Sequence, residues 1–190
     1  MEGKIKLGFA LCGSFCTFKK VIEEMKTLSE KYDIVPIMSE GAAMTDTRFG
    51  TAEEFRETIT EICGREPIVT IKDAEPIGPK ALLDLLLIEP CTGNTLGKLS
   101  NGITDTAVTM AAKAHLRNGR PLVIAVSTND ALGTSAQNIG RLMNAKNVYF
   151  VPMRQDSPTG KPCSVVADFS KTDLAIESAL SGKQAQPVFV

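Results

Sequence analysis

The chain has 190 residues, of which 43 % are apolar and 23 % are charged, and its formal net charge is −1. This length is enough for one well-buried core and short for two domains, and the composition is ordinary for a globular protein. Because both signs of charge are scattered and no basic block occurs, the sequence favours neither a nucleic acid nor an anionic membrane surface as a partner.

The N-terminal segment and the cysteines bear on location. The first apolar run is too short to span a membrane and lacks the layout of a signal peptide. An odd number of cysteines without paired spacing predicts reduced thiols in a cytoplasmic protein. The cysteines are Cys12, Cys16, Cys63, Cys91 and Cys163. With no Cys-x-x-Cys and a single histidine, His115, we expect no metal site.

Apolar runs typical of strands alternate with segments of helical periodicity along the chain. In chain order we expect a strand over 4–12, a helix over 17–32, a strand over 33–38, a polar loop over 39–50, a helix over 51–63, a short strand over 67–71, a strand over 82–90, helices over 97–101 and 105–118, a strand over 120–127, a helix over 135–146, a strand over 147–152, a loop over 153–164 and a helix over 171–182.

Buried strands separated by helices indicate a parallel sheet covered on both faces. We therefore expect a single α/β domain over residues 1–190, doubly wound, Rossmann-like (flavodoxin-like) and three-layered, with five or six parallel strands. Such sheets bind ligands at the carboxyl ends of their strands, near the topological switch point. The loops 12–17, 39–50, 89–95 and 127–134 should converge there.

Three of these loops are rich in Gly, Ser, Thr and Asn. Taken singly, each is also explained by ordinary helix capping. Taken together, they predict a cradle for a phosphate and a polar heterocycle. The cradle residues are Gly13, Ser14, Asn94, Thr95, Ser127, Thr128 and Asn129. Neither a GxGxxG fingerprint nor a Walker lysine accompanies them, so we expect neither a self-contained dinucleotide site nor triphosphate hydrolysis.

Two cations are candidates for binding acidic groups of a ligand. Arg48 lies in the polar loop 39–50, and Lys80 precedes a buried strand. An arginine can bind a carboxylate through two parallel hydrogen bonds, although isolated basic residues are more often solvated surface charges. His115 lies late in an expected helix, where a structural role beside the negative helix end is favoured over catalysis.

Three segments carry a family resemblance: CGS at 12–14, PCTGNTLGKLSNGITD at 90–105 and RPLVIAVSTNDAL at 120–132. Together they resemble the flavoprotein superfamily of FMN-binding cysteine decarboxylases and flavin prenyltransferases. The resemblance implies that Ser14 binds the FMN phosphate and that a Pro-x-x-x-Asn-Thr segment shapes the site. Its positions here are Pro90, Asn94, Thr95, Lys98, Gly102 and Asp105, and a later family segment retains only Asn129. The resemblance also implies a homo-oligomer of trimers or multiples of trimers.

Two departures from the family pattern argue against its usual reactions. Cysteine decarboxylases of this family use a histidine shortly before the Pro-x-x-x-Asn-Thr strand, near Pro76 here, but no histidine precedes His115. The prenyltransferases carry an Arg-Glu pair where this chain has Ser127-Thr128. We therefore expect neither decarboxylation nor prenyl transfer.

One branch of the superfamily fits almost the whole of residues 4–190. The segments TDTRFG, AEPIGPK, TGNTLGKLSN, VSTNDALG and RQDSPTGKPCSVVA are similar to the B-chain family of dipicolinate synthases from spore-forming bacteria. This resemblance implies NADP-linked oxidation of dihydrodipicolinate to dipicolinate in the mother cell, together with an A chain that carries the dinucleotide.

The cradle would then hold FMN or the substrate itself. The dicarboxylate would be bound by Arg48, Lys80, Asn94 and Asn129. No residue stands out as a proton acceptor. Two alternatives stay open: an FMN enzyme acting on another substrate, and a non-catalytic subunit that assembles or activates the A chain.

Overall fold

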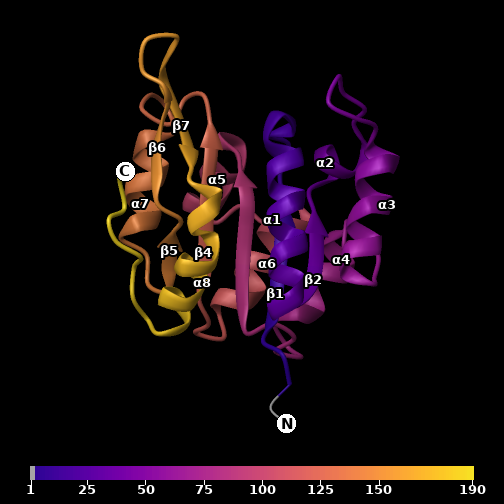
Figure 1. Ribbon diagram of the computed structural model, residues 1–190. Helices are drawn as coiled ribbons and strands as arrows, with labels where there is room; N and C mark the ends of the chain where they lie inside the picture. The colour runs from indigo at the N-terminus through magenta and orange to yellow at the C-terminus, as the bar shows by residue number, and fades with distance from the viewer. Residues whose placement is uncertain (1–2) are drawn as a thin grey trace.

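The computed structural model describes residues 3–190, so the first two residues of the expected domain lie outside the described part. Its strands form one central sheet with helices on both faces (Figure 1). The strands described are β1 (Lys6–Leu11), β2 (Asp33–Met38), β3 (Leu85–Cys91), β4 (Leu122–Thr128), β5 (Val148–Phe150), β6 (Met153–Ser157) and β7 (Lys161–Ala167).

The helices cover the two faces of the sheet. They are α1 (Phe18–Lys31), α2 (Glu40–Met44), α3 (Ala52–Cys63), α4 (Ile71–Ala74), α5 (Gly93–Ser100), α6 (Ala107–Leu116), α7 (Ala136–Met143) and α8 (Thr172–Leu180). Figure 1 shows α1 and α8 in front of the sheet and α6 behind it. Within residues 3–190, no helix combines the length and the hydropathy needed to span a membrane.

Five strands run parallel in the order β2-β1-β3-β4-β5. This is the flavodoxin-like order, whose switch point lies between β1 and β3. The predicted doubly wound α/β domain is therefore confirmed. The carboxyl ends of β1, β3 and β4 meet at one edge of the sheet.

The expected loop over 153–164 is wrong, because this segment lies within the antiparallel hairpin β6–β7. The hairpin extends the sheet at the carboxyl end of β4, where Ser127 and Thr128 pair with Val166 and Val165. Pro and Gly in this segment favour a loop in a prediction from sequence. At a sheet edge such residues are tolerated at strand ends and irregularities, and the β6–β7 register does shift between Gln155 and Ser157.

Two apolar clusters lie on opposite faces of the sheet. Because side chains alternate along a strand, successive strand residues belong to different clusters. Phe9 and Leu11 of β1 pack with α1, α3 and α8, whereas Ala10 packs with α5, α6 and α7. The β3–β4 register shifts between Ile88 and Cys91, so Cys91 falls on the same side as Ile88. A register shift of this kind bends the strand and changes the direction of the chain where the strand ends.

Three smaller expectations differ from the structure. The expected strand over 67–71 is reduced to a single bridge between Ile37 and Ile68, and α4 already begins at Ile71. The polar loop 39–50 contains α2, whose first turn is capped by the Ser39 side chain. The helix expected over 97–101 starts at Gly93, which brings its first turn to the end of β3.

Candidate functional site

An open cleft of about 1400 Å³ lies at the carboxyl ends of β1, β3 and β4. Its walls also include the exposed face of α1 and the β6–β7 hairpin. The cleft brings together most of the predicted site residues: Gly13, Ser14, Arg48, Asn94, Ser127, Thr128 and Asn129. Loops that are far apart in the sequence thus converge at the switch point, as the strand order requires.

The hydroxyl groups of Ser14 and Ser127 lie 2.9 Å apart and join the loop after β1 to the end of β4. Ser14 occupies the position before a short 3-10 turn, yet its side chain caps no backbone N–H. Capping therefore does not account for this serine. Its hydroxyl contacts the Ser127 hydroxyl and, at 4.0 Å, the Cys16 sulfur, and it lines the cleft.

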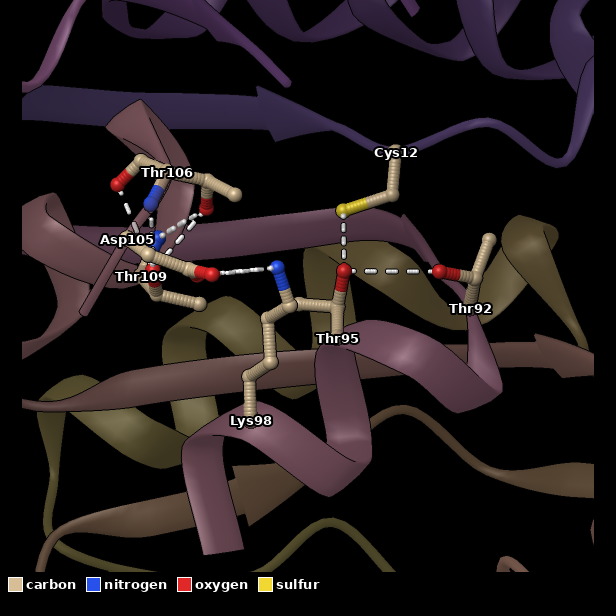
Figure 2. A network of polar contacts seen from close by, with 7 residues as sticks. All are labelled: Cys12, Thr92, Thr95, Lys98, Asp105, Thr106 and Thr109. Carbon is tan, nitrogen blue, oxygen red and sulfur yellow. Dashed lines mark hydrogen bonds and ion pairs between the residues drawn. The ribbon is translucent and has the colours of Figure 1, made fainter. Parts of the chain in front are cut away.

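Thr95 points into the core rather than into the cleft. It is 6 % exposed, and its hydroxyl donates to the Cys12 sulfur at 3.2 Å and accepts from the Thr92 hydroxyl at 3.3 Å (Figure 2). Burial raises the pKa of the Cys12 thiol to about 11, so it stays protonated. Thr95 thus ties α5 to β1, and the structure does not place it with the other cradle residues.

Three further positions that the family resemblance singled out also serve local structure. The Lys98 ammonium lies 2.8 Å from the Asp105 carboxylate and lowers the pKa of that carboxyl (Figure 2). Gly102, between them, has a φ of 70°, which favours glycine. The pair closes the turn from α5 to α6, where Thr106 and Thr109 form a reciprocal cap.

Gly93 fits closely against a small polar cluster. A Cβ there would lie 2.7 Å from Asp130 Oδ1 and 2.8 Å from both Ser135 Oγ and Thr128 Oγ1. The Asp130 carboxylate accepts hydrogen bonds from the Thr128 and Ser135 hydroxyls at 2.6 and 2.9 Å. A carboxylate beside the first residue of α5 is favourable for the helix, but it repels an anionic ligand group at that point. The Ser14–Ser127 pair is the better position for a phosphate.

The two predicted cations lie in different places. Arg48 lines the cleft, and its guanidinium stacks over the Phe49 ring with 4.9 Å to the ring centroid. Lys80 precedes β3 and is therefore at the amino end of that strand, whereas the cleft lies at the carboxyl ends. Lys80 is not among the cleft-lining residues. The structure does not bring it together with Arg48.

Charged residues that sequence reasoning missed line the outer part of the cleft. They are Lys20, Glu23 and Glu24 of α1, together with Arg154, Asp156 and Lys161 of the hairpin. The charges of α1 resemble an ordinary solvated helix face. Those of the hairpin were hidden by the expectation of a loop, because Arg154, Gln155 and Asp156 are all polar and show no alternation typical of a strand.

Glu89 was also missed, although a single carboxyl within the apolar run of β3 is unusual. It is fully buried, and the Thr172 hydroxyl at the start of α8 donates to its Oε2 at 2.7 Å. Oε1 has no partner. Burial raises the pKa of Glu89 to about 8, with a smaller contribution from Glu24. The carboxyl is therefore largely neutral at pH 7.

His115 lies in the core, away from the cleft, in agreement with the structural role expected for it. A ring nitrogen, Nε2, lies 3.0 Å from the Pro121 carbonyl oxygen, and burial lowers the pKa of His115 to about 4. The five cysteines are free thiols. Among residues 3–190, no group of three His, Cys, Asp or Glu side chains is arranged to hold a metal ion.

Comparisons with known proteins agree with this geometry. The family model described as Flavoprotein matches residues 1–174. The B subunit of dipicolinate synthase from Bacillus subtilis (strain 168) is 44 % identical over 191 residues, covering 100 % of this chain and 95 % of that protein.

Solved structures show the same pattern. The crystal structure of the dipicolinate synthase B subunit from Bacillus halodurans C is 44 % identical, with a TM-score of 0.90 and coverage of 98 % of this chain and 96 % of that one. The FMN-dependent cysteine decarboxylase SpaF, at 23 % identity and a TM-score of 0.67 over 93 % of this chain and 95 % of its own, shares the fold. The chain belongs to the flavoprotein family.

Proposed function

We propose that this chain is the B subunit of a dipicolinate synthase and contributes the flavin and substrate cleft for oxidation of dihydrodipicolinate to dipicolinate. The observation that carries this proposal is the Ser14–Ser127 hydroxyl pair, which caps no helix and faces a cleft large enough for a flavin and a small acid. The relatives that are 44 % identical are named for this synthase, which supports the substrate class.

The residues of the cleft fit FMN. Ser14 and Ser127 offer hydroxyl groups to a phosphate, and Asn94 and Asn129 offer amides to the polar edge of a heterocycle. Phe49 and Phe169 also line the cleft and provide apolar surface for a flat ring. When bound, FMN would supply a two-electron acceptor.

The reaction removes a hydride equivalent and a proton from the dihydropyridine ring, which becomes aromatic. The part of this chain is to bind and orient the dicarboxylate, and Arg48, which lines the cleft, would bind one of its carboxylates. The raised pKa of Glu24, which burial and the neighbouring Asp173 cause, makes its carboxylate a better proton acceptor than an ordinary one.

The proposal includes partners and location. NADP is bound by an A chain, since this sequence has no dinucleotide fingerprint. The chain assembles as a homo-oligomer, either a trimer or a multiple of trimers, in the cytoplasm of the mother cell. These features are supported by the family resemblance and by the relative's name, which makes it one subunit of a synthase.

One observation favours a second candidate, a non-catalytic subunit that assembles or activates the A chain. The single histidine is buried against Pro121, so the cleft contains no imidazole for acid–base chemistry. In that case the chain would retain the cleft of its family but would catalyse no reaction there.

FMN titration of the purified chain and its variants tests the cofactor part. Ser14→Ala and Ser127→Ala should each weaken FMN binding about tenfold, because each removes a hydrogen bond to a charged group worth about 1.5–3 kcal/mol. Ser181→Ala, an exposed serine at the end of α8, is the matched control and should bind as the wild type does. Equal affinities for all four proteins would contradict the proposal.

Activity measurements separate the two candidates. Dipicolinate formation should require both chains, and Ser14→Ala in this chain should lower the rate of the combined enzyme. Full activity of the A chain alone would remove any catalytic need for this one. Full activity with Ser14→Ala, together with no flavin in the preparation, would favour the assembly role.

A further inference from the structure

The cleft has two chemically different halves. The half at the strand ends is lined by hydroxyl, amide and backbone groups, and its carboxylate, Asp130, is already held by Thr128 and Ser135. The outer half lies between α1 and the β6–β7 hairpin and is lined by charged side chains. The outer half therefore offers cationic side chains to an acidic group of a ligand, whereas the strand ends offer hydroxyl and amide groups.

Two cations of the outer half are uncommitted. Lys161 is paired with Asp156 at 2.7 Å. By contrast, Lys20 and Arg154 make no ion pair with any side chain among residues 3–190. Both line the cleft, so both are available to a ligand.

Lys20 and Arg154 line the same cleft from two different elements, α1 and the hairpin strand β6. Asp156 has a pKa that is lowered first by Lys161 and, more weakly, by the charge of Lys20, which places Lys20 of α1 near the hairpin. Arg154 and Asp156 share one face of β6, since side chains alternate along a strand. Both line the cleft, whereas the intervening Gln155 does not.

Among residues 3–190, no acidic group lies within ion-pair distance of either cation. Glu24 is one turn further along α1; it lines the cleft but makes no ion pair with Lys20 within 4.0 Å. Glu23, also on α1, lines the cleft without an ion pair to Lys20 within 4.0 Å. Asp168 accepts from the Ser170 hydroxyl at 2.7 Å.

We propose that Lys20 and Arg154 form an anion subsite that binds one carboxylate of the dicarboxylate ligand, while the rest of the ligand extends toward the strand ends. This inference rests on the proposed function and supplies the second carboxylate anchor that Lys80 cannot provide within this cleft. The Arg154 guanidinium offers a two-pronged contact, and the Lys20 ammonium adds a point charge from α1. Binding the acid connects α1 to the hairpin.

The subsite makes the cleft selective for dicarboxylates. Pyridine-2-carboxylate, which lacks one acid group of dipicolinate, can satisfy only one anchor. The affinity ratio between dipicolinate and pyridine-2-carboxylate therefore measures the second anchor. Because the cations are exposed, the ratio should fall as the salt concentration rises.

Calorimetric titration of the full chain with each of these two acids tests the inference. Arg154→Gln and Lys20→Gln should each weaken dipicolinate binding about tenfold and lower its preference over pyridine-2-carboxylate by a similar factor. Arg154→Lys keeps the positive charge but cannot make the two parallel hydrogen bonds of a guanidinium, so it should bind dipicolinate more tightly than Arg154→Gln and less tightly than the wild type. Lys26→Gln, an exposed lysine of α1 outside the cleft, is the matched control and should change neither affinity.

FMN titration of the same variants separates this inference from the proposed function. Unchanged FMN affinity in Arg154→Gln supports a carboxylate subsite distinct from the flavin phosphate. Failure of the wild type to bind FMN would remove the cofactor part of the proposed function but leave the dipicolinate comparison intact. The subsite is overturned if Arg154→Gln and Lys26→Gln bind dipicolinate equally well, if Arg154→Gln weakens FMN instead, or if the wild type shows no saturable dipicolinate binding.

Discussion

The buried carboxyl of Glu89 predicts a specific pH dependence of folding stability. Its pKa is about 8 in the folded chain, because burial disfavours the charged form, against an ordinary value of 4.5. Between these two pH values the unfolded chain loses this proton while the folded chain keeps it. The free energy of unfolding therefore falls by about 1.4 kcal/mol for each pH unit in this window, and the dependence vanishes below pH 4.5 and above pH 8.

Glu89→Gln removes this proton-linked effect and keeps the shape of the side chain. Between pH 5 and pH 8 the wild type should lose about 4 kcal/mol more stability than the variant does. At pH 5 the free energy of unfolding of the variant should equal that of the wild type or be slightly lower. The amide oxygen can still accept from the Thr172 hydroxyl, but the amide places N–H donors where Oε1 has no partner. At pH 8 the variant should be the more stable protein.

Urea unfolding of both proteins at several pH values is the assay. Glu57→Gln, which removes an exposed carboxyl of α3, is the control and should follow the wild type. Parallel stability curves for the wild type and Glu89→Gln would refute the reasoning. That result would mean that the carboxyl gains water or a hydrogen-bond partner when it ionises.

Three further substitutions test the packing beside the cleft and in the core. Gly93→Ala should destabilise the chain by about 1–3 kcal/mol, since its Cβ would lie 2.7 Å from Asp130 Oδ1; unchanged urea unfolding would show that the polar cluster can move aside. Thr95→Val should lower stability by about 1 kcal/mol through loss of the contact to Cys12, and flavin titration should give the wild-type affinity; a large loss of affinity would restore Thr95 to the ligand site. As pH falls from 6.5 toward 4, His115→Gln should lose less stability than the wild type, because the wild-type histidine stays neutral when folded and protonates when unfolded. Coinciding acid unfolding curves of the two proteins would contradict this.

The parallel core of the fold was predictable because its strands are short, continuous apolar runs. The range expected for β2, 33–38, matches the structure, and α3 ends at Gly64, whose φ of 66° favours glycine. The β6–β7 hairpin was not predictable in the same way. Its outer strand is polar because it lies at a sheet edge, so it lacks the apolar alternation on which such predictions depend.

The part of the candidate site that was predictable from the sequence is the convergence of its loops, because the order of the parallel strands alone determines it. Strand order brings Ser14, Asn94 and Ser127 together, whatever their side chains do locally. The direction of an individual side chain depends on packing, so the burial of Thr95 could not be derived from its place in a Ser- and Thr-rich turn. Lys80 does not line the cleft, for a topological reason. It precedes β3 and therefore lies at the amino ends of the parallel strands, whereas the cleft lies at their carboxyl ends.

The turn at 92–95 does not show the expected helix cap. Thr92 is the N-cap residue of α5, but its side chain caps no backbone N–H and donates to the Thr95 hydroxyl instead. Thr92 and Thr95 hold α5 in place through their hydroxyl groups, and Asn94 lines the cleft. Asp130 occupies the space beside Gly93 and disfavours an anion at the start of α5, so we keep the Ser14–Ser127 pair as the proposed phosphate position. Two positions for a flavin phosphate can therefore be told apart by experiment.

A crystal structure of the chain grown with FMN tests the central claim most directly. We expect flavin in the cleft at the carboxyl ends of β1, β3 and β4, with phosphate oxygens within hydrogen-bond distance of the Ser14 and Ser127 hydroxyls. A phosphate bound at Gly93, at the start of α5, or a cleft without flavin at saturating FMN, would contradict it.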